Sequence, residues 1–207
     1  MPAGGIHLCV GKMVAEKLNI NRSMEYYIGI VSADSWRKSS STKLGTHFLD
    51  SIDSIDYHYD VFYEKYSNYM NMDFVVGYLI HLITDKYWYF NNFVTSNIYE
   101  DEYDALKRLC SNLIKQYDIP KLFLPDNLFN PISELDSKGI IYTIDYLNDV
   151  NYVSGDCYKF NINEVIDCIE KTSDYVVNEI TRLKTENLVS VRKWFYEVVV
   201  ACMLCAL

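Results

Sequence analysis

The sequence predicts an all-α, single-domain helical bundle, and three observations support this. Half of the 207 residues are hydrophobic, which is enough to form a sizeable core in one domain. Only eight glycines and four prolines interrupt the chain, which favours long helices over many short strands. Several segments show helical spacing of apolar residues, and none shows the alternation of a half-buried strand. We therefore expect one domain over residues 1–207 with about six to eight helices.

The first 70 residues are expected to form three helices. Their predicted ranges are Cys9–Leu18, Met24–Val31 and Phe48–Met70. The polar segment Ser32–Thr46 between the last two contains a serine run and predicts an exposed loop. Acids recur at every third position of the third helix, which predicts a solvated face made of Asp50, Asp53 and Asp56.

The rest of the chain continues the helical pattern. A buried helix is expected from Asp73 to about Val94, and further helices follow at Glu100–Tyr117, Gly139–Asp149, Asn163 to about Lys184, and Ser190–Leu207. Three of the four prolines fall between Asp118 and Ser137, so this segment is predicted to be a loop. The last helix is apolar enough to be buried.

The net charge and the two ends of the sequence argue against several classes of protein. The formal net charge is −9, and without a basic patch the chain is not expected to bind duplex nucleic acid or anionic membranes. The N-terminus lacks the features of a signal peptide. The apolar run Trp194–Leu207 is too short to cross a bilayer and contains Glu197. We expect a soluble, cytoplasmic protein without a transmembrane segment.

The helix expected at residues 73–92 carries the clearest functional signal. It is apolar nearly all round, apart from His81 and Asp85, which lie four residues apart and hence on one face. A buried imidazole beside a buried carboxylate needs strong partners. A metal ion would satisfy both groups, although a hydrogen bond between the two side chains is the common structural alternative.

Two further histidines and one aspartate add to this signal by their setting. His7 is expected to precede the first helix, His47 lies in a Gly-Thr-His-Phe segment, and Asp34 closes a helical segment. Histidine and aspartate are ligand types that zinc uses. The fourth histidine, His58, is interpreted as an ordinary surface residue.

Taken in order, these residues resemble the zinc-dependent phospholipase C family, whose superfamily also contains the single-strand-specific zinc nucleases. The resemblance rests on five positions within the first 90 residues: His7, Ala33-Asp34, Thr46-His47-Phe48, Gly77 to His81, and Asp85. Members of the family are all-helical and hydrolyse phosphate esters with up to three zinc ions. The resemblance therefore implies a phospholipase C-like fold and a zinc-dependent phosphoesterase.

The same resemblance implies a role for each residue. Asp34, His47, His81 and Asp85 would surround one metal, and Asp85 would bridge to a second metal held by His7. Asp34 matches the aspartate that either binds metal or acts as general base on the attacking water. Two zinc ions a few ångströms apart can hold a hydroxide at neutral pH and bind the phosphate oxygens.

In the family, the free N-terminal amine also binds the second metal. Removal of Met1 would leave Pro2 five residues ahead of His7, so Pro2 is a predicted ligand. The secreted enzymes begin with tryptophan, which this chain does not. Their third site needs further histidines, and after His81 this chain has none, with Asn91 or Asn92 where one would be expected. One or two ions are therefore expected.

The function predicted from the sequence is hydrolysis of a phosphate ester, either a phospholipid or a small phosphodiester, by a metal-bound hydroxide. Zinc is the expected ion, although other divalent metals suit His/Asp ligands. The alternative is a non-catalytic metal-binding helical protein of the same fold. A helical interaction module with an acidic, tyrosine-rich surface stays open as well. An HD phosphohydrolase is disfavoured because the chain contains no contiguous His-Asp pair.

Overall fold

A computed structural model describes residues 3–37, 39–51, 54, 56–91, 93, 103–150 and 159–205, with side chains throughout these ranges except at 103, 150 and 188–205. The described residues form eight α-helices, two short 3₁₀ helices and no strand, which confirms the all-α prediction. The α-helices are α1 (Gly4–Leu18), α2 (Met24–Ser32), α3 (Lys43–His47), α4 (Tyr59–Lys65), α5 (Asp73–Phe90), α6 (Tyr103–Gln116), α7 (Ser137–Val150) and α8 (Ile162–Cys205). The 3₁₀ helices are η1 (Ala33–Trp36) and η2 (Ser67–Tyr69).

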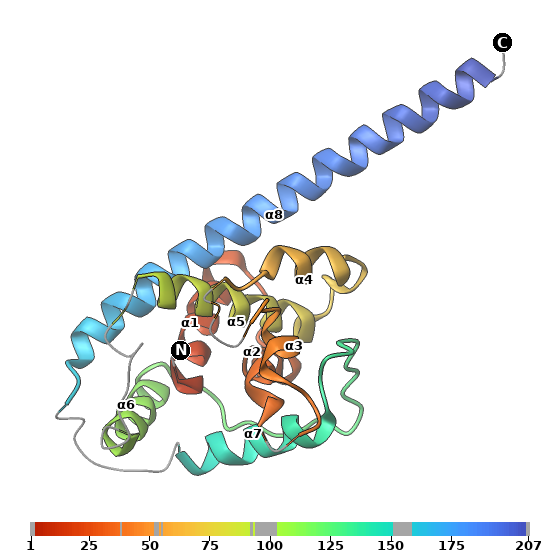
Figure 1. Cartoon of the computed structure of the whole chain (residues 1–207). Coiled ribbons are helices and arrows are strands. Elements are labelled where there is room, and N and C mark those ends of the chain that lie inside the picture. The colour runs from red at the N-terminus through yellow and green to blue at the C-terminus, as the bar shows by residue number, and fades with distance from the viewer. Residues whose placement is uncertain are drawn as a thin grey trace.

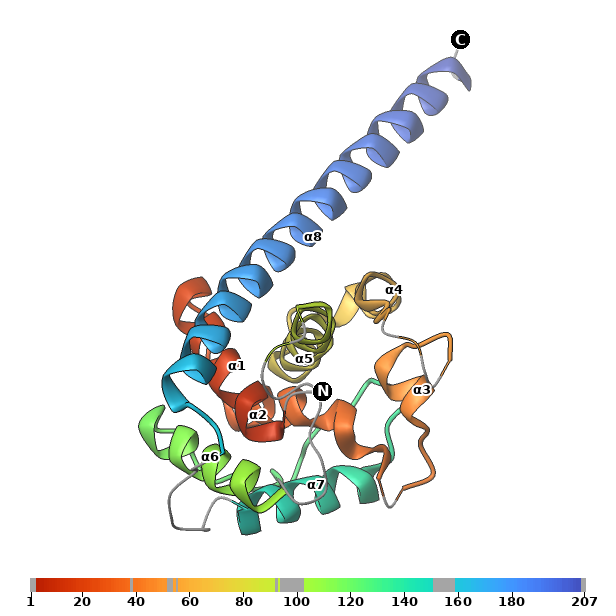
Figure 2. The ribbon, with the colours of Figure 1, turned by 60° about the vertical axis from the view of Figure 1, so that its left-hand side comes forward.

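Helix α5 is the centre of the fold. It packs most extensively against α2 and also contacts α1, α4, α8 and η1. In Figure 2, α5 is seen nearly along its axis, with α1 and α2 on one side and α4 on another. Twelve of its 18 residues are buried, as its nearly uniform apolar sequence predicts.

Two glycines let α2 and α5 approach each other closely. A Cβ atom on Gly29 would lie 2.1 Å from the carbonyl oxygen of Phe74, and one on Gly77 would lie 2.2 Å from that of Tyr26. Both distances are too short for any side chain, so only glycine permits this packing. The close contact positions the end of α2 beside the residues that α5 contributes to the site.

The structure corrects the predicted elements before residue 70. Helix α1 begins at Gly4, so His7 lies inside it and not ahead of it. The expected loop contains η1 and α3. Among the described residues, the segment Phe48–Met70 holds one α-helix as predicted, but this helix is only α4 (Tyr59–Lys65), and Phe48 itself adopts a left-handed conformation with φ 53° that ends α3.

Asp50 and Asp56 therefore do not share a helix face. The backbone N–H of His58 instead donates to the carbonyl of Phe48, which closes the intervening segment. Residue 53 lies outside the described part of the chain. Asp50 and Asp56 both lie ahead of α4 and outside any helix.

The last two predicted helices are one continuous helix, α8. Its first half packs on α1 and α5, and its C-terminal part extends beyond the other helices (Figure 1). Whether the run from Ser190 is buried concerns side chains outside the described set. Among the residues described, no helix is both long and apolar enough to cross a membrane.

Candidate metal centre

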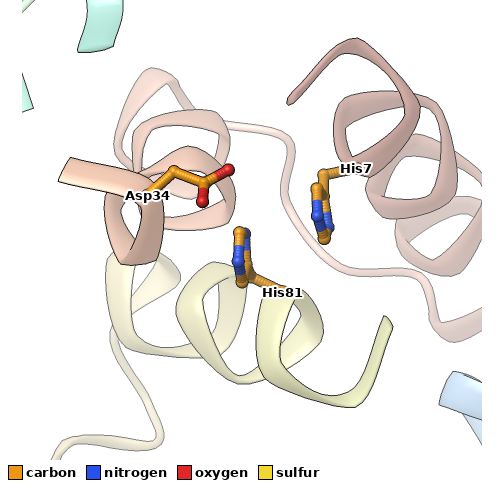
Figure 3. A group of neighbouring side chains, drawn as sticks. All are labelled: His7, Asp34 and His81. Atoms are coloured by element: carbon orange, nitrogen blue, oxygen red, sulfur yellow. The ribbon is translucent and has the colours of Figure 1, made fainter. Parts of the chain in front are cut away.

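Five of the predicted site residues come together in the core. His7 comes from α1, Asp34 from η1 and His47 from α3, while His81 and Asp85 come from α5. Three of these side chains are seen converging from three separate elements in Figure 3. The ligand atoms of His7, Asp34 and His81 lie within 4.8 Å of one another, as do those of His47, His81 and Asp85.

Asp85 is the hub of this cluster. Its Oδ2 lies 3.3 Å from Nε2 of His81 and 3.4 Å from Nε2 of His47, and its Oδ1 lies 3.3 Å from Nε2 of His7. Nε2 of His47 also lies 3.6 Å from Oδ1 of Asp34. The predicted pairing of His81 and Asp85 across one helical turn is therefore present, with three further groups around it.

None of these facing atoms makes a hydrogen bond among the residues described. Seven buried polar atoms of the cluster lack a partner: both ring nitrogens of His7, Oδ1 of Asp34, Nε2 of His47, Nε2 of His81 and both carboxylate oxygens of Asp85. Leaving even one buried polar group unsatisfied costs about 1–3 kcal/mol. A cation could satisfy most of these atoms at once by accepting their lone pairs.

The spacing of the atoms fits a metal ion better than hydrogen bonds. Protein hydrogen bonds between nitrogen and oxygen span about 2.7–3.2 Å. Two ligands at about 2.1 Å from a tetrahedral zinc ion would lie about 3.4 Å apart. The four measured separations, from 3.3 to 3.6 Å, cluster around this second value. The geometry and the donor set therefore fit a divalent cation.

Helix α2 fixes the orientation of the His81 ring. Nδ1–H of His81 donates a 2.6 Å hydrogen bond to the carbonyl oxygen of Ile30. This leaves the lone pair on Nε2, the atom that faces Asp85. The close glycine contact described above brings the two helices near enough for this bond, since Ile30 follows Gly29 and His81 is one turn after Gly77.

The short helix α3 fixes His47 in the same way. The Thr42 side chain caps α3 by accepting from the N–H of Gly45 at 3.1 Å. Oγ1 of Thr46 lies 3.0 Å from Nδ1 of His47 and 3.4 Å from the carbonyl of Lys43. If the hydroxyl donates to that carbonyl, it accepts from Nδ1–H and leaves Nε2 of His47 free to bind a cation.

His7 is held by stacking. Its ring lies parallel to that of His81, with centroids 3.9 Å apart and planes 7° apart. The N-terminal glycines explain why α1 can place it there. A Cβ on Gly5 would lie 2.8 Å from Cβ of Cys110, so the small residue lets α1 approach α6 closely.

The electrostatics of the cluster favour a cation. Burial alone would raise the pKa of Asp85, but His81 and His7 outweigh it and hold the pKa well below its usual range. Burial also opposes ionisation of Asp34, yet His47 and His81 lower its pKa to about 2. Both carboxylates are therefore ionised at neutral pH, and a divalent ion would offset their charge.

The pKa values of His7 and His81 are shifted in opposite directions. Burial, reinforced by His81, lowers the pKa of His7, which keeps that ring neutral and able to bind metal. Burial would also lower the pKa of His81, but Asp85 more than compensates and raises it. A metal ion that binds His81 must therefore displace a proton from its ring.

Solvent reaches the cluster at one residue. The side chain of Asp34 is 20% exposed, whereas those of His7, His47, His81 and Asp85 are at most 1% exposed. Asp34 also has the longest of the four separations. Its Oδ1 is itself buried, so Asp34 and the element that carries it, η1, mark the side of the cluster that is nearest to solvent.

The remaining predictions about site residues concern Pro2, His58 and Asn91. Pro2 lies outside the described residues, so its role as a ligand stays a prediction. His58 is a surface residue, as predicted, and pairs with exposed Asp50 at 2.9 Å. Asn91 caps α5 by donating to the carbonyl of Tyr87.

Several residues that shape the site carry no recognisable signal in the sequence. The carbonyl of Ile30 and the glycines at 29 and 77 act through helix packing, which a single sequence does not reveal. Tyr57 is buried with its ring edge-on to His47, at a centroid distance of 6.0 Å. Burial, followed by the charges of Asp85 and Asp34, raises the pKa of Tyr57, so it remains a neutral phenol.

Comparisons of the chain with protein-family models, with curated proteins and with solved structures gave no match. The assignment of the candidate metal centre therefore rests on the geometry of its residues alone.

Proposed function

We propose that the protein is a metal-dependent hydrolase of phosphate esters, with zinc as the expected ion and a phospholipase C-like fold. The observation that carries the proposal is the set of buried, unpartnered donors from four elements, spaced as zinc ligands are spaced. The resemblance in the order of these residues supports the reaction class. The substrate would be a phospholipid or a small phosphodiester.

In this proposal, three residues would bind the metal ion and Asp34 would lie on the side of the site that is nearest to solvent. His47, His81 and Asp85 form a fully buried group of two histidines and one carboxylate. Catalytic zinc sites commonly use three protein ligands and keep a position open. Asp34, the partly exposed member, would lie at that open position.

A divalent ion at this site would act as a Lewis acid, lowering the pKa of bound water and offsetting charge on phosphoryl oxygens. Because the pKa of Asp34 is about 2, its carboxylate is a weak base. Its main contribution would be to accept a hydrogen bond at Oδ1 from the attacking water and so orient it. The buried histidines would hold their Nε2 atoms fixed and keep other water away.

His7 and Oδ1 of Asp85 would form half of a second metal site. They lie 3.3 Å apart, whereas the other carboxylate oxygen of Asp85, Oδ2, faces His47 and His81. The amine of Pro2, once Met1 is removed, is the proposed further ligand. A second ion here would share the Asp85 carboxylate with the first.

Turnover of bis(p-nitrophenyl) phosphate by the zinc-loaded protein tests this function, with Asp34→Asn as the diagnostic variant. The variant should keep at least one equivalent of zinc and lose about 10²-fold in kcat, as expected when a group that positions the attacking water is impaired. No turnover by the zinc-loaded native protein over a range of phosphodiesters would contradict the proposal.

A non-catalytic metal site is the second candidate, and one observation favours it. If Asp34 binds the ion directly, four protein atoms complete a tetrahedron, as in structural zinc sites. Asp34→Asn would then lower zinc affinity strongly. Loss of zinc in this variant, with no turnover by the native protein, would select this candidate.

A further inference from the structure

The C-terminal part of α8 leaves the helical bundle. Leu183 is the last buried residue of α8 among those whose side chains the structure describes. The helix continues to Cys205 and projects away from the other helices, in Figure 1 and again in Figure 2. At 1.5 Å per residue, the part beyond Leu183 is about 33 Å long. Within the described part of the chain, no other element covers the end of this helix.

The amino-acid sequence of the projecting part changes along the helix axis. Charged and polar residues occur up to Arg192 and Lys193, three aromatic residues follow at 194–196, and the run 198–205 contains no charged residue. Glu197 lies at the boundary between the aromatic residues and this run. A helix that lies flat on a surface instead separates polar from apolar residues around its axis. The order along the axis therefore favours a helix that enters an apolar layer end first.

The charge-free run 198–205 is apolar in every direction around the helix axis. Its sequence is Val-Val-Val-Ala-Cys-Met-Leu-Cys, and at 3.6 residues per turn it completes about two turns. A helix that is apolar all round is normally buried on all sides. Pairing with the same helix of a second copy would cover one stripe of each helix and leave the rest exposed. Lipid chains surround a helix completely, so they fit this run better than a second copy does.

The dimensions of this end of the helix fit one leaflet of a bilayer. The run 198–205 is about 12 Å long at 1.5 Å per residue, and one leaflet contributes about 15 Å of hydrocarbon. Tryptophan and tyrosine are enriched where lipid meets water, and lysine and arginine extend their charged groups toward the headgroups. Trp194 and Tyr196 directly precede the run, and Arg192 and Lys193 precede them. Each residue type therefore falls at the depth that it prefers.

We propose that the C-terminal end of α8 inserts into one leaflet of a lipid bilayer, with residues 198–205 in the hydrocarbon and Trp194 at the interface. Burial of apolar surface drives this contact, so zwitterionic lipid is sufficient and the net charge of −9 does not prevent binding. The bundle with its metal centre stays outside the bilayer, at the other end of the helix. The inference is independent of the metal centre and of the proposed phosphoesterase activity.

Flotation of the full chain with phosphatidylcholine vesicles tests the proposal. The native protein should float with the vesicles equally well at low salt and at about 0.5 M salt, since screening does not weaken an apolar contact. Val199→Asp places a charge in the apolar run and should weaken binding about 100-fold, as expected for an acid at the centre of a membrane helix. Thr185→Asp is the matched control, because it adds the same charge at an exposed position nearer the bundle and should bind as the native protein does.

The fluorescence of Trp194 measures the depth of insertion. Brominated phosphatidylcholine should quench it, and Trp194→Phe should keep vesicle binding but lose this quenching, while Trp36 and Trp88 give the background in both proteins.

Failure of the native protein to float, loss of flotation at high salt, equal flotation of the two aspartate variants, or flotation without quenching of Trp194 would each overturn the proposal. Sedimentation equilibrium identifies the competing arrangement. A native dimer that does not bind vesicles, and that Val199→Asp converts to a monomer, would show that the end of α8 packs on a second copy instead. None of these outcomes alters the test of phosphodiester turnover.

Discussion

Nε2 of His81 and Oδ2 of Asp85 face each other at 3.3 Å across one turn of α5, both completely buried, with no hydrogen bond between them. A pair that served only to satisfy two buried polar groups would be closer and better aligned. Here the atoms point toward a common centre that His47 also faces. This relationship is the reason to interpret the pair as metal ligands.

Zinc should stabilise the fold, because the unfolded chain cannot assemble ligands from four separate elements. At a free zinc concentration 100 times the dissociation constant, the expected gain is about 2.7 kcal/mol. For a chain of this length that raises Tm by about 5–10 °C. Calorimetry with zinc and with a chelator measures the shift. Asp85→Asn should lose it, whereas His58→Gln, at a half-buried histidine outside the cluster, should keep it; an equal shift in both would contradict the assignment.

Thr46 should control zinc affinity through His47. Thr46→Val keeps the shape of the side chain but removes the hydroxyl that pairs with Nδ1 of His47. Loss of such a support for a ligand typically costs 10- to 100-fold in metal affinity. Thr46→Ser, which keeps the hydroxyl, is the matched control. Competition with a chromophoric chelator measures both variants, and equal affinity in the two would exclude this role.

Gly77→Ala should weaken both the fold and the site. The new Cβ would lie 2.2 Å from the carbonyl oxygen of Tyr26, which pushes α5 away from α2 and strains the bond from His81 to Ile30. Overpacking of this kind costs about 1–3 kcal/mol, and urea denaturation measures it. Gly45→Ala is the control, since its nearest neighbour would be Oγ1 of Thr42 at 3.3 Å. Equal stability of the two variants would show that the helices do not meet this closely.

The metal-free protein should be most stable near pH 6.5, through two histidines that act in opposite directions. The pKa of His7 is lowered by burial, so between that pKa and 6.5 only the unfolded chain binds the proton, and stability rises with pH. The pKa of His81 is raised by Asp85, so its contribution is complete below 6.5 and is lost as pH rises through the folded pKa.

Each histidine contributes a slope of at most about 1.4 kcal/mol per pH unit. Asp34 adds a separate loss in acid, between its unfolded pKa of 3.8 and its folded pKa of about 2. Urea denaturation of chelator-treated protein from pH 5 to 8 measures the profile. His7→Gln should remove the rise below 6.5 and leave the fall above it. A profile that rises steadily to pH 8 would contradict the raised pKa of His81.

Much of the site could be predicted because its residues carry local signals. A histidine and an aspartate four apart in an apolar helix identify α5 as the centre. For Asp34 and His47, the resemblance of their order to that in a known zinc enzyme family supplied the prediction. His7 was identified as a ligand but placed ahead of the helix, because Gly4 and Gly5 have low helix propensity and their value lies in close packing with other helices.

What could not be predicted depends on contacts between segments far apart in the chain. Nothing local marks the carbonyl of Ile30 as the partner of His81, or Phe48 as a residue with positive φ. The regular spacing of acids before His58 predicted a helix face, but Asp50 and Asp56 lie outside any helix, ahead of α4. The unbroken helix α8 was divided in two because polar residues interrupt its apolar pattern near residues 184–190.

The most direct test is elemental analysis of purified, untagged protein together with its His81→Ala variant. One or two equivalents of zinc in the native protein, and loss of at least one in the variant, are the expected results. A folded native protein that takes up no zinc or other divalent metal, even when it is supplied, would contradict the metal centre and remove the basis of the proposed phosphoesterase.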